Sequence, residues 1–252
     1  MPVSKSPRGA HGPRRDNEKR HGLARVLSKR GVCSRSQAEK WIAQGRVRVA
    51  GQIVRDPQTP TAPDARIDID GAPAAAAERC YRMLNKPRGY VTTASDERGR
   101  QTVYALLDPQ LPWLAPVGRL DKASEGLLLF TNDSEWAARL TDPAAHRDKT
   151  YHVQIDTLAD AALLQRLAAG VVESGERLAA KSVRTLRHGE KNSWIEIVLD
   201  EGRNRHIRRL LAALDVGVLR LVRVAIGPLQ LGDLPKGQSR ALRAEEVEAL
   251  RG

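Results

Sequence analysis

The chain has 252 residues, 41% of them apolar, which is enough to bury a core in one large domain or in a large domain with a small one. Its formal net charge of +12 is concentrated at one end, because residues 1–60 carry 14 Lys and Arg against 4 Asp and Glu. No apolar run reaches the roughly 18 to 20 residues of a membrane span, and the basic, Pro/Gly-rich N-terminus excludes a secretory signal, so we expect a cytoplasmic protein.

The basic end predicts a polyanionic partner, because Lys and Arg placed on phosphates release condensed counterions. An anionic membrane is the competing partner, but it favours a basic amphipathic helix with exposed Trp, Phe or Leu, so nucleic acid is preferred. Cys33 and Cys80 form no CxxC motif, and the chain has no HExxH motif. This excludes a disulfide scaffold and a recognisable zinc motif, and we expect both thiols to be buried.

Residues 1–20 hold almost no aliphatic side chains and six basic groups, which predicts a disordered basic arm. Leu23, Val26 and Leu27 then recur at helical spacing, and Gly31 marks the end of a first helix.

Ser34 and Gln37 fit the capping box of a second helix, which ends at Gly45. Its inward face is predicted to hold Ala38, Trp41 and Ile42.

A β-hairpin is predicted next, from the alternation of Arg and Val over residues 46–49, a turn at Ala50–Gly51 and a return at Ile53–Val54. Its arginines share one face. Ile67 and Ile69 are expected to close this small domain.

The segment LARVLSKRGVCSRSQAEKWIAQGRVRVAGQIV resembles the S4 RNA-binding domain, which places such a domain at residues 21–70. The resemblance implies that its cations contact RNA; the alternative is an ordinary solvated helix face, against which the local charge argues. The cations are Arg25, Lys29, Arg30, Arg35, Lys40 and Arg46.

Residues 71–79 are rich in Ala and predict a linker. Beyond it, residues 80–252 alternate apolar runs with helical stretches, which is typical of an α/β or α+β domain dominated by a sheet. No GxGxxG, Walker or GxSxG motif supports a nucleotide cofactor or a serine hydrolase. The expected strands are 81–84, 127–130, 151–155, 194–199 and 218–224, and the expected helices are 134–140, 158–169 and 204–214.

The segment GRLDKASEGLLLFTND, residues 118–133, places Asp121 in a polar loop just before an apolar strand. Loops on rigid scaffolds often carry catalytic side chains. From the residues alone, however, this carboxylate could equally pair with Arg119 or Lys122, or cap a turn.

The same segment resembles the signature of RsuA-type pseudouridine synthases, bacterial enzymes that isomerise uridines in ribosomal RNA. Three further segments agree with this resemblance: MLNKPRGYVTT from Met83, DKTYHVQID from Asp148, and EGRNRHIRRLLAAL from Glu201 with its continuation LRLVRVAIGPLQLGDLPKGQSRAL. The resemblance covers nearly everything after residue 20. It implies an α+β fold in which a small S4-like αα-hairpin module is joined to a larger catalytic domain with a mixed, mainly antiparallel sheet, at residues 80–252.

Carried over by position, the resemblance makes Asp121 the essential aspartate, Tyr151 the active-site tyrosine and Arg208 the basic residue near the aspartate. Arg119 corresponds to the arginine implicated in holding the opened RNA.

The family more often has Thr at position 124 and Gln or Glu at position 206, where this chain has Ser124 and His206. Helical spacing puts Arg205 and Arg209 on one face of the 204–214 helix, with Arg208 beside Arg205. We expect these arginines and Arg203 to form a phosphate-facing edge, with a solvated face as the alternative.

These residue types suit the implied reaction, in which the bond from uracil N1 to ribose C1′ breaks and C5 bonds to C1′. A carboxylate can act as nucleophile at C1′ or as base on the 2′-hydrogen, and both routes stay open. Tyr151 can stack on a flipped base for about 1 to 3 kcal/mol, or it can simply pack in the core. No net redox change or hydrolysis occurs, so we expect no cofactor and no metal.

The sequence therefore predicts a pseudouridine synthase acting on ribosomal RNA, with 23S favoured over 16S, or on a pre-ribosomal particle. A non-catalytic RNA-binding assembly factor or RNA chaperone is the alternative. We expect a monomer and no membrane partner.

Overall fold

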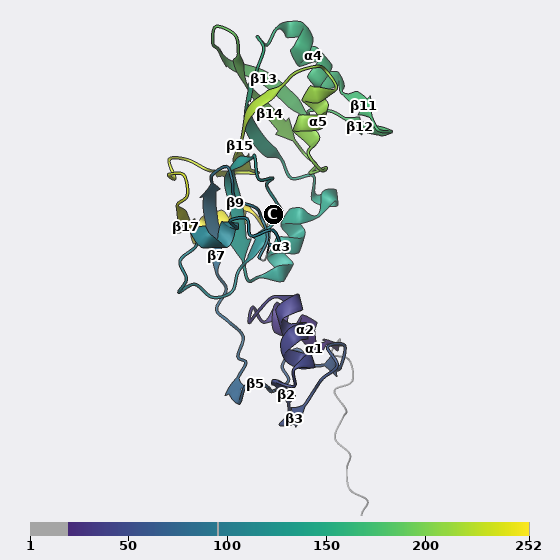
Figure 1. Cartoon of the computed structure of the whole chain (residues 1–252), viewed down its shortest axis with the longest axis vertical. Helices are drawn as coiled ribbons and strands as arrows, with labels where there is room; N and C mark the ends of the chain where they lie inside the picture. The colour runs from purple at the N-terminus through teal and green to yellow at the C-terminus, as the bar shows by residue number, and fades with distance from the viewer. Residues whose placement is uncertain (1–19, 95, 252) are drawn as a thin grey trace, which may run out of the picture. The chain divides into compact units, whose positions relative to one another are not determined.

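The computed structural model describes residues 20–94 and 96–251 (Figure 1). The predicted basic arm, residues 1–20, therefore lies outside the described residues apart from Arg20. In the described part of the chain, no helix combines the length and apolar character that a membrane crossing requires.

The chain divides into two compact units. The smaller unit contains residues 20–27 and 35–75, and the larger unit contains residues 28–34 and 76–251.

The smaller unit combines two helices with a four-stranded antiparallel sheet in the order β3-β2-β5-β6. Its buried side chains come from both helices and from the sheet, with Leu23, Ile42 and Val47 each fully buried. Its elements are β1 (His21–Gly22), α1 (Leu23–Lys29), α2 (Arg35–Ala43), β2 (Val47–Val49), β3 (Gln52–Ile53), β4 (Pro60–Thr61), β5 (Ile67–Ile69) and β6 (Ala72–Pro73).

The two predicted helices and the predicted hairpin are confirmed. The turn forms at Ala50–Gly51, where φ is +49° and +83°, because a two-residue turn with two left-handed residues matches the twist of the strands it joins. Ile67 and Ile69, expected to close the small domain, form β5, which pairs with β2. Ala72 and Pro73, expected in the linker, instead extend this sheet as β6.

Two further side chains differ from the predictions. Trp41 is half-buried rather than inward-facing, and the Arg46 guanidinium lies 5.4 Å from the centre of its ring. Cys33 is buried, which raises the pKa of its thiol to about 11, whereas Cys80 is only half-buried.

The larger unit is built on a nine-stranded sheet in the order β13-β14-β10-β15-β9-β7-β17, with β16 beside β15 and β8 beside β9. Within the described part of this sheet, β15 and β9 are the only strand pair that runs parallel, which confirms a mixed, mainly antiparallel sheet. The strands are β7 (Tyr81–Lys86), β8 (Ala115–Val117), β9 (Glu125–Thr131), β10 (Lys149–Ile155), β13 (Ser182–His188), β14 (Ser193–Leu199), β15 (Val218–Ile226), β16 (Leu229–Gln230) and β17 (Ser239–Ala241).

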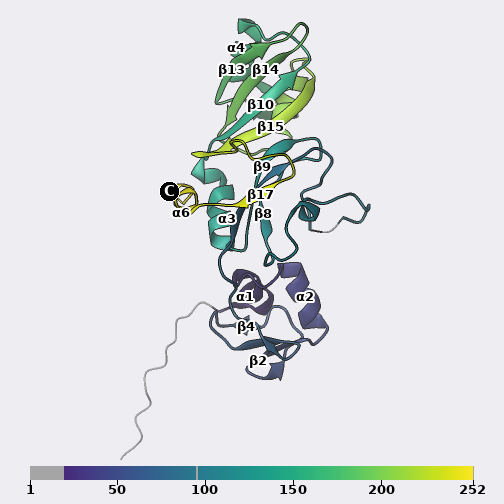
Figure 2. The same ribbon diagram turned by 90° about the vertical axis from the view of Figure 1, so that its left-hand side faces the viewer.

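The sheet has two halves, each with its own helices. Residues of α4 and α5 pack with β10, β14 and β15 in one core, and residues of α3 and α6 pack with β7, β8 and β9 in another (Figures 1 and 2). The helices are α3 (Ser134–Thr141), α4 (Ala161–Ala169), α5 (His206–Ala212) and α6 (Ala244–Ala249), with the 3₁₀ turns η1 (Val103–Leu106) and η2 (Pro143–Ala145) and a separate hairpin of β11 (Val171–Glu173) and β12 (Glu176–Leu178).

All five predicted strands and all three predicted helices of this unit are confirmed, with the predicted helix at 204–214 reduced to α5. The sequence did not predict β13, whose residues 182–188 are all exposed or half-buried at the edge of the sheet. Such a strand carries Ser, Arg and Thr instead of an apolar run, so its sequence lacks the signal of a buried strand.

Candidate active site

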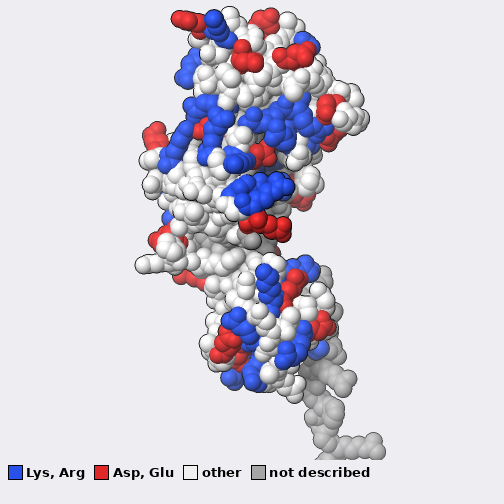
Figure 3. Space-filling model, viewed as in Figure 1, with Lys and Arg blue, Asp and Glu red and all other residues white. Residues whose placement is uncertain are grey.

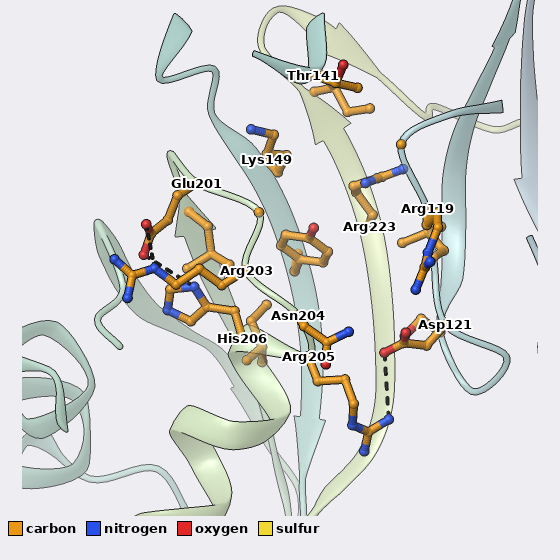
Figure 4. A pocket seen from close by; sticks show the side chains of 18 of the residues that line it. Arg119, Asp121, Thr141, Lys149, Glu201, Arg203, Asn204, Arg205, His206 and Arg223 are labelled. Carbon is orange, nitrogen blue, oxygen red and sulfur yellow. Dashed lines mark hydrogen bonds and ion pairs between the residues drawn. The ribbon is translucent and has the colours of Figure 1, made fainter. Parts of the chain in front are cut away.

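A cavity of about 700 Å³ opens in the larger unit, where the two halves of the sheet meet. The loop before β9, the end of α3, strands β10 and β15, and the segment leading into α5 contribute to its walls (Figure 4). Asp121, Tyr151 and Arg208 all line it, although they come from three distant parts of the sequence. Arg119, Arg203, Arg205 and His206 line it as well.

The loop that carries Asp121 is held through its backbone. Each carbonyl from residue 120 to residue 124 accepts a hydrogen bond from another part of the larger unit or of the loop itself. The donors are Thr92 Oγ1 to Leu120, Lys86 Nζ and Ser124 N to Asp121, Gly89 N to Lys122, Arg208 Nη2 to Ala123, and Lys86 Nζ to Ser124. Such a loop presents its carboxylate in a fixed place before any substrate arrives.

Lys86 contributes most to this arrangement. Its side chain is fully buried, and Nζ donates to the carbonyls of Pro87, Asp121 and Ser124 at 3.1, 3.0 and 2.8 Å. Burial lowers the pKa of this ammonium to about 8, while the charges of Asp121 and Glu125 oppose that shift. The three protons of the charged form thus match three carbonyl acceptors.

The Asp121 carboxylate faces two guanidinium groups. Its closest ion pair is with Arg205, whose Nη1 lies 3.7 Å from Oδ2 (Figure 4). Burial lowers the pKa of Arg208, and repulsion from the Arg205 charge lowers it further, whereas the Asp121 charge raises it. We expected Arg208 to be the companion of the carboxylate; the ion pair is made by Arg205, and the Arg208 guanidinium binds the Ala123 carbonyl at 3.1 Å.

Tyr151 belongs to β10 and is half-buried, with its side chain packed against the apolar clusters on both sides of the cavity. Its position on the cavity wall leaves part of the aromatic ring available to a ligand. Arg119 is exposed and lies on the same wall as Asp121 (Figure 4).

The remaining arginines of the 201–214 segment do not form the expected phosphate-facing edge. Arg205 precedes α5 with φ of +49°, so it does not share a helical face with Arg209. Arg209 is held by Glu173 and Glu176 of the β11–β12 hairpin. Arg203 pairs with Glu176 and Glu201 at 3.3 and 2.8 Å. These carboxylates already neutralise Arg203 and Arg209.

The two departures from the family pattern are both buried. Ser124 lies in the supported loop, and its carbonyl accepts from Lys86. His206 has Nδ1 3.5 Å from a carboxylate oxygen of Glu201, and burial lowers the pKa of the imidazole.

The predicted RNA-binding residues near the N-terminus differ in how free they are. Arg25 and Lys40 are exposed and form no ion pair with described residues, while Arg35 lies 3.6 Å from Glu39. Arg46 binds Asp70 through two nitrogens, which lowers the pKa of that carboxyl. Lys29 and Arg30 are half-buried residues of the larger unit, and Lys29 lies 3.1 Å from Glu135.

Basic side chains also gather on one face of the larger unit (Figure 3). Three cations that the sequence analysis did not select contribute to the site. Lys149 and Arg223 line the cavity, and Lys86 supports the loop that carries Asp121. The sequence does contain a feature that points to Lys86: it follows an apolar strand and precedes Pro87 within the segment MLNKPRGYVTT, which matches the family.

Comparison with known proteins matches the chain to two family models: RNA pseudouridylate synthase over residues 81–213 and S4 domain over residues 22–67. It is 35% identical to the ribosomal large subunit pseudouridine synthase B of Bacillus subtilis, over 91% of this chain and 95% of that one. It is 38% identical to the protein of the same name from Pseudomonas aeruginosa, over 90% of this chain and 61% of that one.

A crystal structure of a pseudouridylate synthase superposes with a TM-score of 0.65 at 31% identity, covering 91% of this chain and 99% of the other.

Proposed function

The chain belongs to the RNA pseudouridylate synthase family and isomerises uridine to pseudouridine; from this premise we propose that its substrate is a uridine of ribosomal RNA and that Asp121 is the reacting carboxylate. The observation that carries the proposal is the convergence of Asp121, Tyr151 and Arg208 on one cavity from separate segments of the chain.

The reaction requires a group that acts at the sugar. The N1–C1′ bond breaks, the uracil turns while it is held, and C5 bonds to C1′; C5 then loses its proton and N1 gains one. Asp121 can attack C1′ or remove the 2′-hydrogen, and its side chain is one-third exposed to the cavity, so a nucleotide can reach it.

The neighbours of Asp121 suit this chemistry. Arg205 places a positive charge 3.7 Å from the carboxylate oxygen. Tyr151 offers a face on which the extruded uracil can stack, worth about 1 to 3 kcal/mol, which offsets part of the cost of flipping the nucleotide.

Ribosomal RNA of the large subunit is the favoured substrate because the two named relatives are large-subunit synthases. This substrate implies a cytoplasmic location, where bacterial ribosomes are assembled. We propose that the chain acts as a monomer.

The test is release of tritium from 5-tritiated ribosomal RNA, with 23S and 16S fragments assayed separately. The wild-type chain should release tritium from a 23S fragment. Asp121→Asn should lower the rate by at least about 1,000-fold, because it removes a group that acts only in the chemical step, while RNA affinity changes little.

Asp142→Asn is the matched control, because Asp142 lines the same cavity and its side chain accepts from the Ala144 amide, which asparagine can also do. It should retain activity. Release from 16S alone would overturn the subunit assignment, and an active Asp121→Asn would overturn the role of the carboxylate. Tight binding without release from any fragment would favour an assembly factor.

A further inference from the structure

Arg223 is a buried guanidinium whose hydrogen-bonding capacity is only partly used. The residue is 6% exposed, lies on β15 and lines the cavity. Nε donates to the Leu127 carbonyl at 2.8 Å, whereas Nη2 is buried and has no hydrogen-bond partner among the described residues. An unsatisfied buried donor on a charged group costs free energy, so a ligand that accepts a hydrogen bond from this nitrogen would be stabilised there.

An irregularity in β15 directs Arg223 toward the cavity. Thr150 faces Ala225 across the β10–β15 pair, but Tyr151 faces Arg223, so β15 holds one extra residue at Val224. A bulge of this kind shifts the alternation of side chains. Arg223 and Ile226 therefore both line the cavity, although residues three apart in a regular strand point to opposite faces.

Lys149 adds a second positive charge to the lining of the cavity. It lies two residues before Tyr151 on β10, so both side chains share the cavity face, and Arg223 is the cross-strand neighbour of Tyr151. Burial is the largest influence on the pKa of Lys149 and lowers it, and the charge of Arg223 lowers it further. Asp200 and Asp148 raise this pKa, and Arg147 lowers it.

The carboxylates that line the cavity are engaged elsewhere. Asp121 pairs with Arg205, Glu201 pairs with Arg203, and Asp142 accepts from the Ala144 amide. Within residues 20–94 and 96–251, no carboxylate forms an ion pair with Lys149 or Arg223. The view in Figure 4 separates these two cations from the Asp121–Arg205 pair.

We propose that Arg223 and Lys149 form a subsite for a phosphodiester of the flipped nucleotide, placed beside Tyr151 and away from Asp121. The proposal rests on the proposed function and adds which part of the substrate these residues bind. A flipped nucleotide brings a neutral base and anionic phosphate into the cavity. The phosphate is repelled by Asp121 and attracted by two cations, one of which has the planar fork that suits phosphate oxygens.

The first test measures how RNA binding depends on salt. Arg223→Gln and Lys149→Gln should each weaken the affinity about 10-fold for a short single-stranded fragment that the wild-type chain converts, and should each reduce the slope of log K against log salt by about 0.7. Arg166→Gln is the control, because Arg166 is an exposed cation of α4 outside the cavity, and it should leave both quantities unchanged.

The second test changes the RNA instead of the protein. Neutral methylphosphonate linkages are introduced singly on either side of the target uridine. At one of the two positions the substitution should weaken wild-type binding about 10-fold and should abolish the additional loss caused by Arg223→Gln. Additive losses at both positions would overturn the proposal, since two groups in contact must show coupling.

A purely structural role for Arg223 predicts a different pattern. Loss of the bond to Leu127 would lower the unfolding temperature while the salt slope of the folded protein stayed at the wild-type value, and this result would overturn the subsite. Contact with a uracil carbonyl would also leave the slope unchanged. The outcome is separable from the proposed function, because tritium release by the wild-type chain tests that function independently.

Discussion

At the scale of single residues, the geometry of the loop that carries Asp121 depends on a lysine that is remote in sequence. Lys86 is 35 residues before Asp121, yet its ammonium binds the carbonyls of Asp121 and Ser124 in this loop. The side chain is fully buried and has no carboxylate in hydrogen-bond contact among the residues that the structure describes, so three carbonyl acceptors compensate for its desolvation.

The pKa of about 8 for Lys86 predicts that, as the pH rises above 8, activity falls while the contribution of this group to stability rises. Above pH 8 the amine loses one of its three donors, so activity should fall. The folded pKa lies below the unfolded value of 10.5, so the unfolded chain binds more protons between pH 8 and 10.5, and the contribution of this group to the free energy of unfolding rises there. A pH profile of tritium release and of unfolding should show both trends.

Lys86→Met should lose about 2 to 4 kcal/mol of stability, because it leaves the buried carbonyls without their donor. Its residual activity should lack the loss above pH 8. An unchanged pH profile in this variant would show that another group is responsible.

At the scale of elements, the central strand β9 explains why the loop that carries Asp121 is anchored to a rigid element. Every residue of Glu125–Thr131 is buried, because β9 is covered on one face by α3 and α6 and on the other by the segment that carries Leu114 and Leu120. Such a strand is apolar without alternation, as its LLLF run shows.

The contact between β9 and β15 requires a glycine. Gly126 has φ of +99°, and a Cβ there would lie 2.2 Å from the Arg223 carbonyl oxygen. Gly126→Ala should therefore destabilise the larger unit by at least about 3 kcal/mol, measured by denaturant unfolding, because backbone on both sides must shift.

Gly175→Ala is the matched control, since Gly175 has φ of +76° but nothing within 4 Å of the added atom. It should cost only the strain of the left-handed backbone, about 1 to 2 kcal/mol. Equal losses in the two variants would contradict the steric explanation.

At the scale of the whole molecule, positive charge is distributed between two kinds of site. The cavity is lined by Arg203 and Arg205, which are paired with carboxylates, and by Arg223, which is buried, whereas Arg25 and Lys40 of the smaller unit are exposed and form no ion pairs with described residues. The exposed cations suit general attraction of RNA, and the buried ones suit recognition of a single nucleotide.

The double variant Arg25→Gln/Lys40→Gln should weaken RNA binding and reduce its salt slope by about 1.4, while turnover at saturating RNA stays close to wild type. Arg166→Gln/Lys191→Gln removes the same charge from exposed positions of the larger unit and serves as control. An equal effect of the two pairs would indicate that net charge alone, and not the smaller unit, attracts RNA.

Local sequence patterns were sufficient for much of the fold. The apolar runs at 127–130 and 194–199 predicted central strands, and Ala50–Gly51 predicted its turn, because burial and turn chemistry act over a few residues. The pocket residues Asp121 and Tyr151 were named through their motifs, and their roles stay predictions that the tritium assay tests.

Sequence by itself thus determined the family of the chain, the positive charge of its N-terminal part and the candidate for the reacting group. Only the tertiary structure decided which cation pairs with Asp121, because a left-handed residue places Arg205 outside the helix that spacing predicts. The tertiary structure also shows that Lys86 binds the backbone of the loop and that Arg223 lines the cavity. Strand pairing and a one-residue bulge fix those contacts, and neither leaves a periodic signal in the sequence.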